Sequence, residues 1–273
     1  FPGQGFPDII QDQLNKPLKT IILVTFALFW FIAGLLTLLG YIDILHRFIN
    51  PELSKAWLIA IFLLILCFVI QIPTKKVMYL HEIILFINVP FIVFIFFKAV
   101  TSEYLSWDSN FEAGTHFYSM PNISAIAVAS YVFSGYTNII IFNRLFKVKL
   151  KGVNFLIIFG LSILTLFTSV MVPIGMHGVD KVSEYIYPWI LMVDSLRLPY
   201  SPIERALFIF LMLYINITLI SVAVHWHVAF ELMKGTFSRG KGKKKNRIVL
   251  ALFFTIPILL VIRIDYMQPE LLS

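Results

Sequence analysis

Seven long runs of apolar residues, separated by short polar segments, set the class of fold that this chain can adopt. Several of them reach the roughly 20 residues that a helix needs to cross a bilayer. Hydrophobic residues make up 59% of the chain and charged residues 14%, whereas a soluble domain carries about 25% charged residues. Because the bilayer interior tolerates only helices or closed barrels, the runs predict an all-α polytopic membrane protein with one transmembrane domain over 1–273. The expected spans are 21–45, 56–72, 78–100, 122–146, 153–175, 204–233 and 248–264.

The distribution of Lys and Arg predicts the orientation of these spans. The segments before the first span and after the second, fourth and sixth hold 15 of the 22 basic residues, while segment 101–121 carries acidic residues and no Lys or Arg. Since basic loops stay in the cytoplasm, the N-terminal end of this chain is predicted to be cytoplasmic. The tract 239–247 is expected to be a flexible loop on that side. The formal charge of +7 then favours contact with anionic membrane lipids and not with nucleic acid.

The fourth span contains a polar cluster in its middle. Ser134, Gly135, Tyr136 and Thr137, followed by Asn138, combine weak helix formers with a glycine, which predicts a break in the helix. Exposed backbone groups at such a break are tolerated where they line a cavity, as in transporters whose broken helices hold the substrate. The alternative is a close helix packing contact through small residues.

Two further spans carry polar stripes at helical spacing. Tyr214, Thr218 and Ser221 fall on one face of the sixth span, and Trp30, Gly34 and Thr37 share a face of the first. Each stripe alone is typical of helix packing, but stripes beside a broken helix favour a pocket. The residues predicted to bind a substrate are Trp30, Gly34, Thr37, Phe133, Ser134, Gly135, Tyr136, Thr137, Tyr214, Thr218 and Ser221.

Motifs for catalysis or metal binding are incomplete. His81 and Glu82 begin a zinc-protease pattern, but Leu85 stands where the second histidine is required. His225 and His227 lie on opposite faces of a helix and cannot chelate one ion together. We therefore expect no metal site, no cofactor and no enzymatic activity.

Several motifs along the chain resemble those of the B subunit of spore germinant receptors, in the amino acid-polyamine-organocation transporter superfamily. The most specific are Tyr187-Pro188-Trp189 before Pro199 and the Glu204-Arg205 pair after Ile203, while the run from Tyr131 to Asn138 contains the Gly135 break that all relatives share. The resemblance implies a LeuT-like inverted-repeat transporter fold with ten spans. The seven runs here resemble spans three to nine, so the first two spans and the last are expected to be missing. The segment 189–198 would form short helices that cap the binding site.

The resemblance also implies a function. The chain would be a membrane subunit that binds a small germinant such as an amino acid, acts with the receptor A and C subunits, and resides in the inner membrane of a bacterial spore. Two alternatives remain open at this point. One is an amino acid permease of the same fold, and the other is a noncatalytic membrane scaffold.

Overall fold

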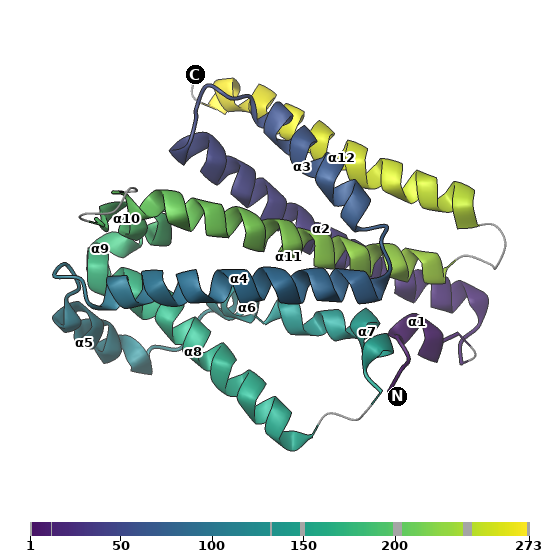
Figure 1. Ribbon diagram of the computed structural model, residues 1–273, viewed down its shortest axis with the longest axis horizontal. Helices are drawn as coiled ribbons and strands as arrows, with labels where there is room; N and C mark the ends of the chain where they lie inside the picture. The colour runs from purple at the N-terminus through teal and green to yellow at the C-terminus, as the bar shows by residue number, and fades with distance from the viewer. Residues whose placement is uncertain are drawn as a thin grey trace. The chain divides into compact units, whose positions relative to one another are not determined.

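The protein is described by a computed structural model, which covers residues 2–11, 13–131, 133–147, 151–198, 204–236 and 242–271. These residues are almost entirely helical (Figure 1). The β structure found among them is an isolated bridge between Arg197 and Arg205. The prediction of an all-α chain is therefore confirmed.

Among the described residues, five helices are long and apolar enough to cross a membrane, which makes the protein polytopic. Each falls on a run that the sequence predicts as a span. They are α2 (Lys16–Phe48), α4 (Thr74–Val100), α8 (Gly152–His177), α11 (Ala206–Gly235) and the part Lys244–Arg263 of α12 (Gly242–Leu271). The run expected at 56–72 forms the shorter apolar helix α3 (Lys55–Val69).

The run expected at 122–146 is interrupted, as the sequence predicts. Helix α6 (Ile123–Tyr131) is followed by the 3-10 helix η2 (Ser134–Asn138), a turn of α-helix α7 (Ile139–Phe142) and a second 3-10 turn, η3 (Asn143–Leu145). The chain bends by 57° between α6 and the segment that starts at Ser134. The break thus falls on the polar cluster.

Short helices occupy the connecting segments. They are α1 (Phe6–Ile9), α5 (Trp107–Thr115), η1 (His116–Tyr118), α9 (Val179–Val182) and α10 (Pro188–Ser195). Helix α10 lies where short helices are expected. Helix α12 already begins at Gly242, so the second half of the basic tract is helical and not a flexible loop. Parts of the predicted motifs lie outside the described residues, namely Val132, Pro199, Ile203 and 239–241.

The chain divides into two compact units, of which unit 1 comprises Phe1–Ile84, Asn138–Lys149 and Ile215–Ser273. Its centre is Trp226, which is completely buried on α11. The Trp226 ring stacks on Phe31 of α2 at a centroid distance of 5.4 Å and meets Phe253 of α12 edge-on at 5.6 Å. Helix α3 packs alongside α12 and α2 (Figure 1).

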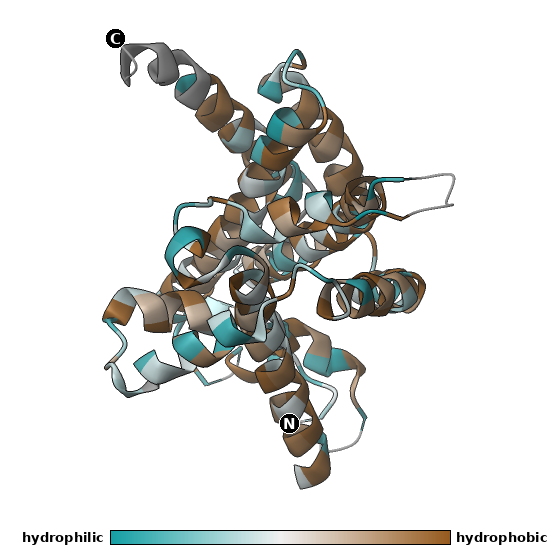
Figure 2. Cartoon of the chain, turned by 90° about the vertical axis from the view of Figure 1, so that its left-hand side faces the viewer, coloured by the Kyte–Doolittle hydropathy of each residue, from teal (hydrophilic) through white to brown (hydrophobic). Residues whose placement is uncertain are grey.

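Unit 2 comprises Leu85–Thr137 and Leu150–Tyr214. Its core joins α4, α8 and α10 through buried residues such as Ala99, Val172 and Met192. Outside this core, large apolar side chains of both units remain exposed; the exposed fraction reaches 82% for Phe86 and 74% for Phe68. Apolar residues run along most of each long helix (Figure 2). Such surfaces are stable only against lipid or another apolar partner.

Candidate ligand site

The break in the fourth predicted span is held by tight backbone turns. The Phe133 amide donates to the Ser130 carbonyl at 3.0 Å, and the Tyr136 amide donates to the Phe133 carbonyl at 3.1 Å. These bonds join residues three apart, which is the 3-10 pattern, and Thr137 adds a side-chain bond to the Ser134 carbonyl. A 3-10 stretch within a long helix often marks a functional hinge. The predicted residues Phe133, Ser134 and Thr137 are therefore all part of this break.

Gly135 stands in open space. A methyl group added to its Cα would have no heavy atom within 4 Å outside its own helical neighbourhood. Within unit 2, the next residue, Tyr136, is anchored by a hydrogen bond between its hydroxyl group and Ser162 Oγ of α8, with the two oxygens 2.9 Å apart. Ser162 is buried. Gly135 is exposed, so the space beside it is open surface of the described residues and not an enclosed pocket.

Asn138 closes the break and belongs to unit 1. Its side chain is 7% exposed, and its Oδ1 accepts a hydrogen bond of 2.7 Å from Trp30 Nε1 of α2. The structure thus explains why an asparagine can lie within an apolar span: a buried amide oxygen needs a donor, and the indole supplies one. The indole of Trp30, a predicted site residue, is therefore the donor to Asn138.

The other predicted residues of α2 have partners within unit 1. Gly34 lies against the indole of Trp226, and an added Cβ would come within 2.6 Å of that ring. Glycine at this position therefore lets α2 and α11 approach each other closely. Thr37 bonds to the Ala33 carbonyl one turn earlier. These contacts describe packing, and a role of Gly34 or Thr37 in ligand binding stays a prediction.

The stripe on α11 is buried to different degrees along its length. Thr218 is 3% exposed, and the Ser221 carbonyl is 2.7 Å from Nδ1 of His225 in a hydrogen bond. Tyr214, at the end of unit 2, stacks on Phe210 with ring centroids 5.6 Å apart. Asn216, on the other side of the helix, is exposed. Thr218 is therefore buried, Tyr214 and Ser221 are half-buried, and a role of the stripe in ligand binding stays a prediction.

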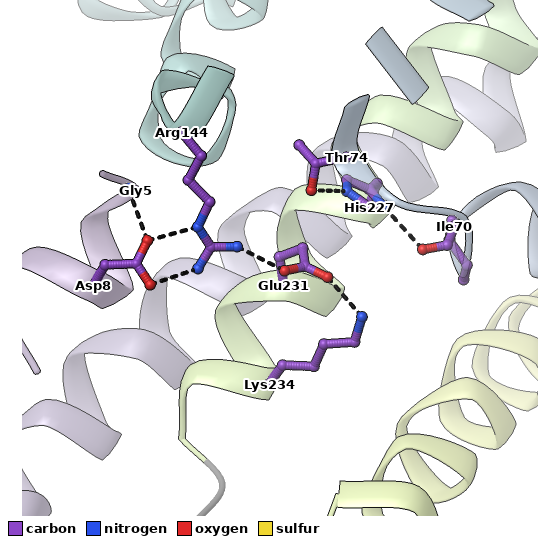
Figure 3. A network of polar contacts seen from close by, with 8 residues as sticks. All are labelled: Gly5, Asp8, Ile70, Thr74, Arg144, His227, Glu231 and Lys234. Atoms are coloured by element: carbon purple, nitrogen blue, oxygen red, sulfur yellow. Dashed lines mark hydrogen bonds and ion pairs between the residues drawn. The ribbon is translucent and has the colours of Figure 1, made fainter. Parts of the chain in front are cut away.

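A second polar constellation lies within unit 1, and Figure 3 shows it. Arg144 of η3 binds Asp8 of α1 through two nitrogens, with Nε 2.7 Å from Oδ2 and Nη2 3.0 Å from Oδ1. Its Nη1 donates to Glu231 Oε2 at 2.8 Å, and Lys234 donates to the other oxygen of that carboxylate at 2.6 Å. We call Asp8, Arg144, Glu231 and Lys234 the charged network.

The N-terminal segment is fixed to the end of the broken span by this network and by neighbouring bonds. The Gly5 amide donates to Asp8 Oδ2 at 2.9 Å, and Asn143 Nδ2 donates to the Gln4 carbonyl at 2.8 Å. Burial by itself would raise the pKa of the Asp8 carboxyl group, but the bonds from Arg144 and Gly5 outweigh burial and hold this pKa below its ordinary value. Asp8 is therefore a stable anion that attaches the segment.

Near the charged network, His227 of α11 joins two further elements of unit 1. One ring nitrogen is 2.9 Å from the Ile70 carbonyl at the end of α3, and the other is 3.0 Å from Thr74 Oγ1 at the start of α4. The ring is fully buried, and both nitrogens have partners. Among the described residues, no group of three His, Cys, Asp or Glu side chains is placed to hold a metal ion.

A family model described as spore germination protein matches residues 1–269. The chain belongs to this family. It is therefore a germination-related membrane protein, and the family assignment that the sequence motifs suggested is confirmed. No curated protein and no solved structure matches the chain.

Sequence reasoning missed the charged network of this spore germination protein. In the sequence, Arg144 is a basic residue of a predicted loop after the run that ends at Asn138, and Asp8 precedes the first predicted span by 13 residues. One signal was available: Glu231 and Lys234 are three residues apart near the end of an apolar run, which favours an ion pair on one helix face. Nothing in the spacing indicates that Arg144 and Asp8 would join them.

Proposed function

We propose that the protein is the ligand-binding membrane subunit of a spore germinant receptor. It binds a small germinant such as an amino acid at the break that follows Tyr131, and it passes the signal to A and C subunits. The inner membrane of the spore is its proposed location, with the N-terminal end of this chain in the cytoplasm. The proposed architecture is a LeuT-like inverted repeat.

The observation that carries this proposal is the open space at Gly135 within a 3-10 break. In transporters with discontinuous helices, the helix ends at the break point toward charged groups of the substrate, and the similar break here supports an amino acid as the ligand. Tyr136 and Thr137 follow the glycine, and their hydroxyl groups bond to Ser162 Oγ and to the Ser134 carbonyl. An amino acid needs acceptors for its ammonium group and donors for its carboxylate group.

Binding and uptake measurements on one preparation test the proposal. The full chain is reconstituted in proteoliposomes, and each of the twenty amino acids is supplied in radiolabelled form. We expect saturable binding of at least one of them without accumulation inside the vesicles. Accumulation would support the permease instead, and the absence of both binding and uptake would support the scaffold.

The first mutational prediction concerns Gly135→Val. The β-branched side chain occupies the open space and stiffens the break, so the germinant concentration for half-maximal response should rise at least about tenfold, which corresponds to a loss of about 1.4 kcal/mol. Spore germination followed by the fall in optical density measures this response, and immunoblotting of the membrane fraction measures insertion.

Gly160→Val on α8 is the matched control, since Gly160 also has no neighbour within 4 Å of an added Cβ. That variant should respond like the unmodified protein. A normal dose response of Gly135→Val at equal abundance in the membrane would refute the site at the break.

A further inference from the structure

Beyond Asn138, the broken span continues as a short half-helix that comprises α7 and η3, residues 139–145. The half-helix is attached within unit 1 at both ends. At its start, Trp30 donates to the Asn138 side chain, and Asn138 is buried. At its far end, Asn143 and Arg144 bind the segment before and within α1. The position of the half-helix in unit 1 thus depends on contacts at two separate places.

The segment 3–10, which we call the N-terminal strap, contacts the far end of the half-helix closely (Figure 3). The Gly3 amide donates to the Asn143 carbonyl at 3.2 Å, in addition to the amide and ionic bonds described above. Gly5 makes the close approach possible, because an added Cβ would lie 2.9 Å from Arg144 Nε. The strap therefore binds the half-helix through backbone, side-chain amide and ionic bonds.

The other contacts of the strap are with α2 and α11. Phe6 meets Phe26 of α2 edge-on, with ring centroids 5.5 Å apart. Pro7 approaches the end of α11 so closely that a Cβ added to Gly235 would lie 2.8 Å from it. Helix α1 has four residues, too few for a helix that is stable on its own. The contacts with its neighbours therefore hold the strap in place.

The bonds of the half-helix differ in how readily water can replace them. Asn138 is buried, so its side-chain oxygen would lose its donor without compensation if the Trp30 bond broke. The Asp8 side chain is 42% exposed, against 14% for the Glu231 side chain, so water replaces the Asp8 bonds to Arg144 more easily. Arg144 also keeps its bond to Glu231 when Asp8 leaves. The strap can therefore detach without leaving a buried charge unpaired.

We propose that the N-terminal strap is a releasable fastening of the half-helix. It holds the far end of the half-helix in the resting protein, and it detaches when the protein responds to a germinant. The Asp8–Arg144 pair then sets how much germinant is needed, because the response includes the free energy of breaking this pair. The inference rests on the proposed function in one respect: the germinant acts at the break, which the half-helix directly follows in the chain.

A permanent anchor is the alternative role for the strap. An anchor supports the active arrangement of the half-helix, so weakening it would impair the response. A releasable strap opposes the response, so weakening it makes the protein more sensitive. The direction of the change in germinant sensitivity therefore separates the two roles.

A charge substitution measures this direction. Spores in which this chain is the only member of its family are triggered with serial dilutions of yeast extract, so that the result does not depend on which small molecule is the germinant. Asp8→Asn should lower the half-maximal concentration about two- to fivefold, which is the range that a partly exposed ion pair provides. An unchanged or raised value at equal abundance in the membrane would overturn the proposal.

Two further variants accompany Asp8→Asn. Arg144→Lys keeps a positive charge near Glu231 but cannot form the two parallel bonds to Asp8, so it should also lower the half-maximal concentration. Asp43→Asn is the matched control: it breaks ion pairs near the opposite end of α2, away from the half-helix, and should leave the concentration unchanged. Equal shifts in Asp43→Asn and Asp8→Asn would overturn the proposal.

A covalent link tests the release directly. Gln4→Cys and Asn143→Cys are combined in a Cys67→Ala background, since the Asn143 side chain bonds to the Gln4 carbonyl and the two positions are adjacent. We expect spores with the oxidised pair to give no response at any dilution and to recover it on reduction, while each single cysteine responds under both conditions. A full response of the oxidised pair, with the disulfide verified by mass spectrometry, would overturn the proposal.

The outcome is separable from that of the proposed ligand site. A normal response of Gly135→Val refutes the site at the break, but the strap variants are read from the response to yeast extract, whatever its active component and wherever that component binds. Conversely, an oxidised pair that responds fully refutes release of the strap and leaves amino acid binding at the break intact.

Discussion

At the scale of single residues, Arg144 contributes the most distinctive geometry. Its guanidinium group joins carboxylates from two elements and presents Asp8 with two parallel bonds, which a lysine ammonium group cannot reproduce. The Arg144 side chain is 26% exposed and that of Glu231 is 14% exposed, so water screens these pairs only in part. The Asp8 side chain is more exposed, with an exposed fraction of 42%.

The lowered pKa of Asp8 predicts a pH dependence of stability. Since the pKa is lower in the folded chain than its ordinary value of about 3.9, the Asp8 anion stabilises the fold above pH 4, and this contribution is lost as the pH falls through the folded pKa. Asp8→Asn should therefore lower the free energy of unfolding by up to about 1 kcal/mol at pH 7, a partly exposed pair being screened by water. Thermal unfolding in detergent between pH 7 and pH 3 measures the difference from the unmodified chain.

That difference should shrink below about pH 4 as the native carboxylate becomes protonated. The same substitution at the exposed Asp180 on α9 is the control and should change stability little at any pH. A difference between Asp8→Asn and the unmodified chain that persisted unchanged down to pH 3 would show that the Asp8 charge does not act through Arg144.

At the scale of elements, the polar stripe on α11 provides the second site-directed prediction. Thr218→Val and Ser221→Ala remove hydroxyl groups from the striped face, whereas Asn216→Leu alters the exposed side, about 160° to 180° away. If the stripe takes part in recognition, the first two variants should raise the half-maximal germinant concentration about threefold or more, which corresponds to one lost hydrogen bond, and Asn216→Leu should not. Germination dose responses at matched membrane abundance measure the effect, and equal effects of all three would make the stripe a packing surface.

The elements differ in how far sequence alone predicts them. The length of an apolar run predicts each long helix, and adjacent weak helix formers predict the break at 134–138. Both signals lie within a window of about 20 residues. Asn138 is different, because its partner Trp30 is 108 residues away and no local pattern links them. Helix α5 was missed for the same reason, because the Ser106 amide at its start bonds to the Gly175 carbonyl, 69 residues away.

At the scale of the whole molecule, the assignment to family spans three to nine depends on the predicted orientation of the chain in the membrane. A cysteine at Gly242 should be cytoplasmic and one at Ser109 external, since basic residues flank the first position and acidic residues the second. In a Cys67→Ala background, an impermeant thiol reagent on intact cells should label the Ser109 position, and the Gly242 position should require permeabilised cells. The reverse pattern would overturn both the orientation and the numbering of the spans.

The charged network also has a consequence for biosynthesis. Asp8 leaves the ribosome early, but its partner Arg144 is 136 residues further along the chain, and Glu231 follows 87 residues after Arg144. At about 5–20 residues per second, the N-terminal segment waits roughly ten to forty seconds before all of its partners exist. Until Arg144 has been synthesised, the carboxylate of Asp8 lacks this partner. The complete network can therefore form only after the end of α11 has been synthesised.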